Sequence, residues 1–515
     1  MEQHQQQQLC ASGSLRKMVQ DNLSLENIFD SYLKCRANKR NSRAALEFEY
    51  DAEEKLFRLW ERLVDGTYHP SRSICFVINK PKLREIFASS FEDRVVHHVL
   101  VRYLEKIWEP KFVFDSYSCR VGKGVHLAVK RLQRFISQVS SNGVRRTFYL
   151  HVDIKDFFMT VDKEVLFGFI SRHVNDKRML GLARKIIFSD PTGDFIFLGR
   201  NRQALKNVPE NKSLFNKNNK QGLPIGNLTS QFFANVYLDP IDQYVKHNLK
   251  CRHYVRYCDD MILLENSSEQ LKEWRQSIEE YAAKILRLQL NKRATHIAPV
   301  NNGIDFLGFI TRKDYILVRR RSVGNLKIRL RKFENLLTKE TAFGTLFKYD
   351  IEVCDKLLHT LNSYLGHFKF ADTYKLIDKI FLRHSFLNEY YVRSGKKVIR
   401  NYNFRQRYSN LAAQYWLYRR KYQGYLVFFQ VGCFIEFYGR HANVAQKLFG
   451  LHVKYYHKRL RPRCGFPVRR LNEYIDIAGR EKTPFVVIRQ TGREGVKIMQ
   501  RDIAWRFVPE CVTLS

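Results

Sequence analysis

Two adjacent acids interrupt an apolar segment near the middle of the chain. Residues 254–264 read Tyr-Val-Arg-Tyr-Cys-Asp-Asp-Met-Ile-Leu-Leu, so Asp259 and Asp260 separate two strand-like runs. Burying neighbouring carboxylates is costly unless a cation compensates them, and the pair therefore favours a divalent metal site. The alternative is a solvated hairpin turn, where aspartate is common. A third carboxylate elsewhere in the chain would favour the metal.

Asp153 is the candidate for that third carboxylate. Residues 147–158 read Thr-Phe-Tyr-Leu-His-Val-Asp-Ile-Lys-Asp-Phe-Phe, and an apolar strand would deliver Asp153 at its end. With Asp259 and Asp260 it would hold two divalent cations roughly 4 Å apart, as in-line phosphoryl transfer requires. Mg²⁺ prefers such oxygen ligands, with Mn²⁺ as an alternative. Asp153 could instead be a turn or cap residue, because Lys155 and Asp156 follow closely.

The composition indicates a polyanionic partner. The chain has 515 residues with 89 Lys and Arg against 51 Asp and Glu, a formal net charge of +38. Nucleic acid is the expected partner of so basic a protein. No apolar run approaches the roughly 20 residues of a membrane-spanning helix. The ten cysteines form no C-x-x-C pair, so we expect a reducing cytoplasm and no disulfide framework.

The elements that would position these acids are mixed. Apolar spacing predicts helices between residues 23 and 64, and β-rich runs alternate with helical stretches beyond. The expected strands are 74–78, 147–152, 196–198, 254–257 and 261–264, and the expected helices are 92–108, 124–139, 229–248 and 267–288. Residues 206–220 are rich in Asn and Lys and predict an exposed loop. The pattern favours an α/β or α+β fold.

Composition also divides the chain into segments. Residues 1–20 are polar and predicted to be disordered. The mixed body follows at 21–312, and a basic, helical segment at 313–405. We expect a linker at 406–421, because the chain becomes β-rich and aromatic from 422 to 515.

Several motifs resemble the reverse-transcriptase family in order and spacing. Phe148–Phe158 resembles the first catalytic motif of that family, and Tyr257–Asp260 resembles its Tyr-x-Asp-Asp box. The supporting segments are 82–86, 115–120, 290–292 and 306–309, and the resemblance spans roughly residues 70–400. It implies a right-hand polymerase with fingers and palm at 21–312, a helical thumb at 313–405, and RNA-directed DNA polymerase activity.

The resemblance also implies individual roles. Phe158 matches the steric gate that excludes a ribose 2′-hydroxyl, although it could also be an ordinary core aromatic. Arg84 and Arg120 match fingers residues that contact the incoming nucleotide, a task suited to the planar guanidinium. Arg84 could equally be a solvated surface charge. Lys292 matches a lysine near the triphosphate.

One motif narrows the resemblance. Residues 221–231 read Gln-Gly-Leu-Pro-Ile-Gly-Asn-Leu-Thr-Ser-Gln, and the run from Ile225 through Gly226 to Gln231 resembles diversity-generating retroelements. Their enzymes misincorporate opposite template adenines. Isoleucine at 225 can only pack against the nascent pair, and glycine at 226 would let the backbone approach the template base. Alternatively, the segment is a structural turn. Another bacterial reverse transcriptase, of the antiphage-defence or group II intron type, is the second interpretation.

The C-terminal segment resembles the mismatch-recognition domain of MutS, over roughly residues 422–508. Phe434 and Glu436 fall on the Phe-x-Glu motif of that family, in which the phenylalanine wedges against a mispaired base. Cys433 replaces an acid often found there, and the other MutS domains are absent. Phe434 could instead be a core aromatic. The resemblance implies a module that grips mismatched duplex or otherwise positions nucleic acid.

Together these resemblances imply the partners of the chain. They are a template RNA, the cDNA and RNA–DNA duplex, dNTPs, and a small basic accessory protein of the retroelement. The implied setting is a bacterial or phage-encoded cytoplasmic protein. A catalytically silent nucleic-acid scaffold is the third interpretation, and the presence of all three carboxylates disfavours it.

Overall fold

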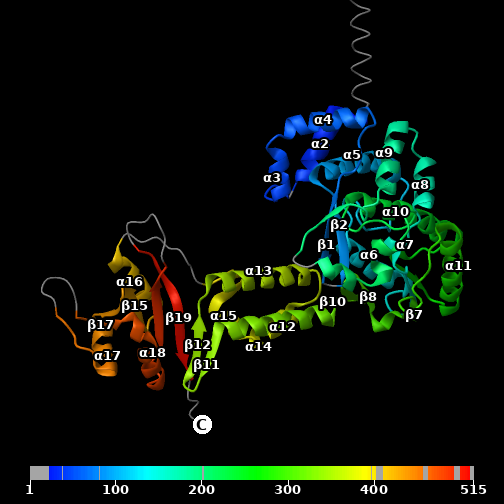
Figure 1. Cartoon of the computed structure of the whole chain (residues 1–515). Helices are drawn as coiled ribbons and strands as arrows, with labels where there is room; N and C mark the ends of the chain where they lie inside the picture. Colours follow the sequence, from blue (N-terminus) through cyan, green and yellow to red (C-terminus); the bar gives the residue numbers. More distant parts are fainter. Residues whose placement is uncertain are drawn as a thin grey trace, which may run out of the picture. The chain divides into compact units, whose positions relative to one another are not determined.

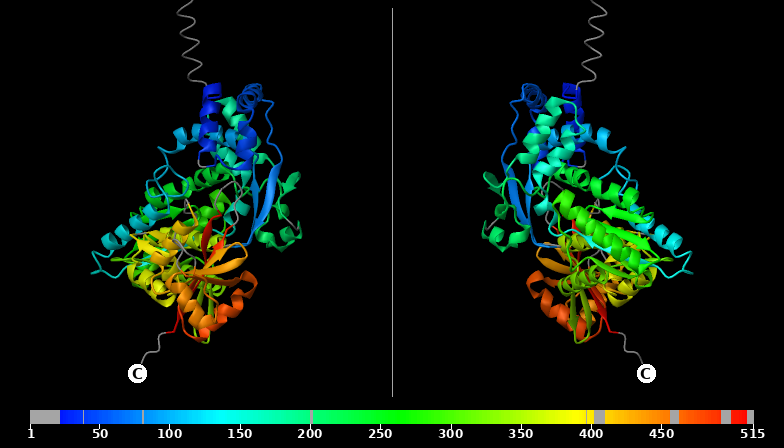
Figure 2. Two further views of the ribbon diagram at one scale, coloured as in Figure 1. Left: turned by 90° about the vertical axis from the view of Figure 1, so that its left-hand side faces the viewer. Right: turned by 90° about the vertical axis from the view of Figure 1, so that its right-hand side faces the viewer.

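The computed structural model describes residues 22–37, 39–79, 82–199, 202–395, 397–401, 410–455, 462–491 and 499–510. The expected disordered segment, residues 1–20, lies outside these ranges. The chain divides into two compact units, residues 1–307 with 311–314 and residues 308–310 with 315–515. Figure 1 labels their elements, Figure 2 gives two further views, and each unit is described by itself. Among the described residues, no helix is long and apolar enough to cross a bilayer.

The first unit begins with a layer of helices. Side chains of Ser24 and Ser90 accept hydrogen bonds from the first turns of α2 and α5 and so fix where these helices begin. One apolar face of each helix enters the main core, which explains the helical spacing of residues 23–64. The helices are α2 (Leu25–Arg36), α3 (Arg43–Glu49), α4 (Ala52–Val64) and α5 (Phe91–Trp108).

A small sheet of order β2-β1-β4 follows these helices. Its strands are β1 (Ser73–Ile78), β2 (Arg84–Ala88) and β4 (Phe195–Phe197). The expected loop at 206–220 is more ordered than its composition indicates, because it contains 3-10 turns and the buried Leu214. Buried Glu85 of β2 holds this segment by accepting hydrogen bonds from Ser213 Oγ and from the Leu214 backbone N–H. These two hydrogen bonds satisfy the buried Glu85 carboxylate, and they fix the loop beside β2.

The sheet that positions the acids has four strands in the order β5-β6-β3-β7. They are β3 (Phe148–Asp153), β5 (Tyr254–Tyr257), β6 (Asp260–Glu265) and β7 (His296–Pro299). The helices that accompany it are α6 (Val125–Val139), α7 (Phe157–Thr160), α8 (Lys163–Ser171), α9 (Lys177–Phe188), α10 (Leu228–Gln243) and α11 (Ser268–Leu286). The strands and helices predicted around the acids are therefore confirmed, and the mixed α/β class with them.

The second unit begins with the basic helical segment. It contains α12 (Arg320–Leu337), α13 (Ile351–Phe368), α14 (Tyr374–Arg383) and α15 (Leu387–Tyr390). Two hairpins interrupt the helices, β11 (Thr338–Thr341) with β12 (Gly344–Lys348) and β13 (Tyr391–Ser394) with β14 (Lys397–Arg400). The basic, helical segment expected at 313–405 therefore also contains two hairpins. The short strands β8 (Ile304–Phe306), β9 (Phe309–Thr311) and β10 (Ile316–Val318) precede α12.

A seven-stranded sheet of order β11-β12-β19-β18-β15-β16-β17 completes the second unit. Its other strands are β15 (Leu426–Val431), β16 (Phe434–Tyr438), β17 (Arg463–Pro467), β18 (Phe485–Gln490) and β19 (Arg501–Pro509). One face packs against α17 (Arg440–Phe449) and α18 (Leu471–Arg480). The hairpin β11–β12 belongs to this sheet although it lies within the expected thumb, because β12 pairs with β19.

The opposite face of the sheet carries α16 (Leu411–Lys421). Tyr415 of this helix contacts Phe429 of β15 and Tyr438 of β16, with ring centroids 5.4 and 4.9 Å apart. Residues 411–421 are therefore a packed helix and not the expected linker. Residues 406–409 of that predicted linker lie outside the described ranges.

Candidate active site and nucleic-acid interface

Strand register brings the three predicted acids to one end of the four-stranded sheet. Asp153 ends β3 and lies directly opposite Asp260, the first residue of β6. Tyr257 of β5 is also opposite Asp260, so Cys258 and Asp259 form a two-residue turn. Cys258 has a φ of 55°, as tight hairpin turns of this length require. Pairing of three strands thus converts two distant sequence motifs into one acidic site.

The electrostatics of this site are those of crowded carboxylates. Burial raises the pKa of Asp259 to about 6, and repulsion from Asp153 and Asp260 adds to the increase. Neighbouring carboxylates that repel in this way are stabilised by a cation. Asp153 is held in place by Asn291, whose Nδ2 donates to Asp153 Oδ2 at 2.8 Å and whose backbone N–H donates to the Asp153 carbonyl.

Asp260 is bound to a histidine. His151 Nε2 lies 2.6 Å from Asp260 Oδ1. Burial lowers the pKa of His151, but hydrogen bonding and attraction to Asp260 outweigh that effect and raise its pKa overall. Within the described ranges, no three His, Cys, Asp or Glu side chains are arranged to hold a metal ion. Asp153 likewise has a partner within the chain, because it accepts from Asn291.

The donor set nevertheless fits Mg²⁺. This ion binds through one or two carboxylates and takes its remaining ligands from water and substrate phosphates. Asp153 and Asp259 supply two such oxygen donors, and their mutual repulsion is the imbalance that a divalent cation would relieve. The predicted ligand set of Asp153, Asp259 and Asp260 stays a prediction, and Asp260 is also bonded to His151.

A buried ion pair holds the acidic turn in place through a hydrogen bond to its backbone. Arg256 of β5 and Asp242 of α10 are both fully buried, with Arg256 Nη2 2.6 Å from Asp242 Oδ2. Arg256 Nη1 also donates to the Cys258 carbonyl, inside the turn, and to Asn235 Oδ1, each at 3.1 Å. Arg256 Nη2 reaches Ser116 Oγ at 3.0 Å. The Arg256 guanidinium thus connects the acidic turn to α10 and to the 115–120 segment.

Three contacts of the site were not predicted, those of His151, Asn291 and Arg256, although the first two residues lie within the quoted motifs at 148–158 and 290–292. Each is a polar side chain in or beside an apolar strand. Buried polar groups require partners, so their position alone signals a network. The sequence shows that signal but does not show which partner satisfies it.

Phe158 and Ile225 share a small apolar cluster. Both pack partly buried against Phe87, Met159 and neighbouring side chains. The Phe158 carbonyl accepts a hydrogen bond from the Leu223 N–H at 2.7 Å, which ties the two motifs together. The Phe158 ring contacts Phe157 and is also partly exposed.

Gly226 makes a close approach to β2. Its φ is +128°, and a Cβ there would meet Ile86 Cγ2 at 2.8 Å and the Phe87 carbonyl at 3.0 Å. The Ile225 carbonyl accepts from the Phe87 N–H at 2.9 Å. The glycine is therefore required by the packing of this turn on β2, a reason that differs from the expected approach to a template base.

The predicted nucleotide contacts differ in accessibility. Arg84 begins β2 and is exposed, and Lys292 is exposed beside Asn291. Gln231 on α10 is exposed and accepts from Cys119 Sγ at 3.4 Å. Arg120 is nearly buried because it pairs with Glu109 at 2.9 Å and also donates to the carbonyls of residues 113 and 116. Contact of Arg120 with a triphosphate would require release of these bonds.

In the second unit, Phe434 and Glu436 lie on the α16 face of the sheet. Phe434 begins β16 and is 44% exposed, so the alternative of a core aromatic is wrong. Glu436 accepts a hydrogen bond from the Tyr438 hydroxyl, and Arg463 Nη1 lies 3.8 Å from its carboxylate. The roles that the Phe-x-Glu resemblance implies for Phe434 and Glu436 stay a prediction, and contact of Glu436 with a base would compete with its bond from Tyr438.

Comparison with known families bears on both units. Residues 78–311 match the family model described as Reverse transcriptase (RNA-dependent DNA polymerase). These residues include β3, β5 and β6 and hence all three acids. The chain contains a reverse-transcriptase domain. Its enzyme class is that of the RNA-directed DNA polymerases, which are nucleotidyltransferases and use divalent metal ions.

The reverse-transcriptase domain has curated relatives. Protein YkfC of Escherichia coli K12 is 25% identical over 298 residues, covering 51% of this chain and 71% of that protein. The group II intron-encoded protein LtrA of Lactococcus lactis is 28% identical over 197 residues, covering 38% of this chain and 28% of LtrA. The chain thus spans less than a third of LtrA.

Two further comparisons concern the second unit and a solved structure. Residues 409–509 match the MutS domain I model, in agreement with the predicted resemblance. The telomerase of Candida albicans, solved with a fragment of telomeric RNA, is 13% identical with a TM-score of 0.34. This likeness covers 58% of this chain and 54% of that one.

Proposed function

We propose that the chain synthesises DNA on an RNA template, with Mg²⁺ bound at Asp153 and Asp259. The observation that supports this most directly is the juxtaposition of the strand end at Asp153 with the Tyr-Cys-Asp-Asp turn inside a reverse-transcriptase domain. The substrates would be template RNA, a primer and dNTPs. Primer extension on a defined RNA, with and without Mg²⁺, tests the proposal.

The chain's own residues would prepare the reaction. Asn291 and the strand pairing fix the direction of the Asp153 carboxylate, and Arg256 fixes the turn that carries Asp259. Bound Mg²⁺ would favour ionisation of the primer hydroxyl and neutralise charge on the triphosphate. Phe158 would pack beside the sugar, and exposed Arg84 and Lys292 would supply positive charge for phosphates.

We further propose that this enzyme is of the diversity-generating type and makes adenine-mutagenised cDNA. The support is the 225–231 motif, together with the position of Ile225 in the apolar cluster that also contains Phe158. The second candidate is a group II intron-like enzyme, favoured by the likeness to LtrA. A small basic accessory protein would accompany the first candidate, and a near-repeat of a template region beside the gene would separate the two.

Replacement of Ile225 by glutamine is expected to lower misincorporation opposite template adenine. A polar side chain in this cluster could hydrogen-bond near the nascent pair, and 1–3 kcal/mol of added discrimination corresponds to roughly 10–200-fold. Sequencing cDNA made on a defined RNA measures the error rate at each template base. Ile225→Val is the matched control, because it keeps an apolar side chain. An unchanged adenine error rate in the glutamine variant would contradict the assignment.

We also propose that the MutS domain I-like module grips mismatched template–cDNA duplex through Phe434 and Glu436. The exposed Phe434 ring supports this, because aromatic wedges insert at weakly stacked steps. Phe434→Ala is expected to weaken binding to a mismatched duplex about tenfold and to leave matched duplex nearly unaffected. Fluorescence anisotropy with both duplexes measures this, and Val444→Ala, an exposed apolar residue on α17, is the control. Equal affinity of wild type and Phe434→Ala for the mismatch would rule the wedge out.

A further inference from the structure

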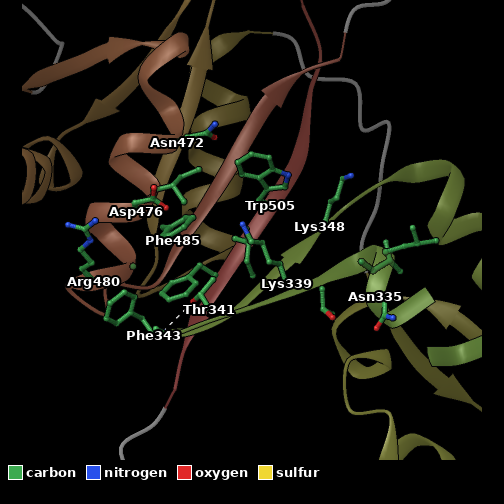
Figure 3. Close-up of a pocket in the computed structure, with 18 residues that line it drawn as sticks. Asn335, Lys339, Thr341, Phe343, Lys348, Asn472, Asp476, Arg480, Phe485 and Trp505 are labelled. Carbon is green, nitrogen blue, oxygen red and sulfur yellow. Dashed lines mark hydrogen bonds between the residues drawn. The ribbon is translucent and has the colours of Figure 1, made fainter. Parts of the chain in front are cut away.

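The seven-stranded sheet is wider than the two helices that pack on it. The cluster formed with α17 and α18 is built around β15, β16, β17 and β18, whereas β11 and β12 extend the same face beyond α18. A cavity of about 800 Å³ lies there, lined by α18 on one side, by β11, β12 and β19 on the other, and by the end of α12 (Figure 3). It belongs wholly to the second unit.

Strand register determines which side chains face this cavity. Lys348 of β12 is directly opposite Trp505 of β19, and Leu346 is directly opposite Phe507. Directly opposed residues of antiparallel strands share a face. Phe507 and Leu346 contact the core beneath α18, so Lys348 and Trp505 also point to the helix side of the sheet.

The next strand adds a second cation to the same face. Lys339 of β11 is directly opposite Leu346 and therefore also lies on the cavity side. Arg480, in the last turn of α18, lines the cavity from the other wall. Figure 3 shows Lys339 and Lys348 on the hairpin and Asp476 and Arg480 on the helix.

The cavity combines free positive charge with aromatic rings. Lys339, Lys348 and Arg480 are exposed and form no ion pair with a residue in the described ranges, and the cavity lining contains a single acid, Asp476. Phe343 and Trp505 line the cavity and are partly exposed. Arg489 adds a further cation 5.7 Å from the Trp505 ring centroid. Aromatic rings bordered by unpaired cations match the two parts of a nucleotide, a flat base and a phosphate.

We propose that this cavity binds an unpaired nucleotide of the nucleic acid that the enzyme handles. The base would stack on Trp505 or Phe343, and the phosphates would contact Lys339, Lys348 and Arg480. The volume lies within the roughly 300–1,000 Å³ typical of ligand sites. The site is distinct from the wedge residue Phe434, which is on the opposite face of the sheet. The inference rests on the proposed function only in taking nucleic acid as the ligand.

The test measures binding without dNTPs. The probes are fluorescein-labelled oligouridylate, oligothymidylate and a blunt RNA–DNA duplex. Trp505→Leu is expected to weaken binding of the single strands by roughly 5–150-fold, the loss of one stacked base. The double variant Lys339→Gln with Lys348→Gln is expected to reduce the slope of log K against log salt by about 1.4, because two phosphate contacts are lost.

The control is a second double variant, Lys447→Gln with Lys454→Gln. It removes the same charge from exposed residues of the same unit, away from the cavity, and is expected to leave the slope unchanged. An oligouridylate carrying one 5-iodouridine should crosslink under ultraviolet light to Trp505 or Phe343. Loss of that adduct in the Lys339 and Lys348 variant would confirm the site.

Two results would overturn the inference. One is single-strand affinity in both cavity variants equal to that of the control, and the other is crosslinking that reaches neither Trp505 nor Phe343. Failure of the proposed function would be a different observation, namely that the wild-type chain does not extend primers. The binding test does not depend on that activity. A preference for oligouridylate over oligothymidylate would identify RNA as the source of the nucleotide, and the reverse would identify DNA.

Discussion

Replacement of Asp259 by asparagine is expected to abolish DNA synthesis while leaving the chain folded. Asparagine keeps the shape of the side chain but removes the charge that would hold the cation. The loss of several kcal/mol of charge stabilisation in the transition state corresponds to at least about a thousand-fold in rate. Primer extension on a defined RNA at saturating Mg²⁺ measures the effect.

The same change is expected to preserve or raise the melting temperature. Asp259 is repelled by Asp153 and Asp260, and its burial has already raised its pKa to about 6. A neutral amide removes that repulsion from the metal-free protein. Loss of activity with unchanged or improved stability would therefore separate a catalytic role from a structural one.

Glu265→Gln is the matched control for Asp259→Asn. Glu265 ends β6, at the opposite end of the strand from Asp260, so the substitution removes one carboxylate from the same strand away from the site. We expect this variant to extend primers at the wild-type rate. An Asp259→Asn protein that extends primers as fast as Glu265→Gln would refute the metal assignment.

Removal of the Arg256 side chain is expected to have the largest effect on stability. Arg256→Met leaves Asp242 as a fully buried charge without its main partner, which costs about 3–5 kcal/mol. Asn235 Oδ1, Ser116 Oγ and the Cys258 carbonyl also lose a donor. Denaturant unfolding measures the change in the free energy of unfolding. Arg43→Met is the control, because Arg43 and Glu47 form an exposed pair that solvent screens, so its loss should leave the free energy of unfolding nearly unchanged.

A second variant separates stability from positioning of the turn. Asp242→Leu together with Arg256→Met removes both charges and is expected to recover about half of the lost stability, because the Tyr254 hydroxyl still loses its acceptor. The turn would remain without the hydrogen bond to the Cys258 carbonyl, so the kcat of primer extension should stay low while the KM for dNTP changes little. If the double variant regained full activity as well as stability, Arg256 would act on the fold alone.

The strands around the acids could be predicted because their signals are local. The apolar run 147–153 ends in Asp153, and in 254–264 two apolar runs flank the acids at a turn; such short-range patterns determine strand and hairpin formation. The Tyr-Cys-Asp-Asp turn follows in the same way from its two-residue length. The reverse-transcriptase and MutS resemblances agree with the family matches over residues 78–311 and 409–509.

The partners of individual side chains could not be predicted in the same way. Arg120 pairs with Glu109, Asp260 with His151, and Gly226 packs on β2, and each contact depends on where a distant segment lies. A charged residue in a motif has the same sequence signature whether it faces a substrate or a buried partner. Only the packed structure distinguishes the two environments.

The sequence by itself thus determined the polymerase class, the strand ends that carry Asp153 and Asp259, and the presence of a second, β-rich module. The tertiary structure alone decided that Asp260 is held by a histidine, that residues 411–421 form a packed helix, and that the hairpin β11–β12 completes the C-terminal sheet. The physical reason is the range of the interactions. Propensity and turn chemistry act between neighbours in the chain, whereas register between distant strands is set by the global fold. The cavity beside Trp505 exists only because of that long-range pairing.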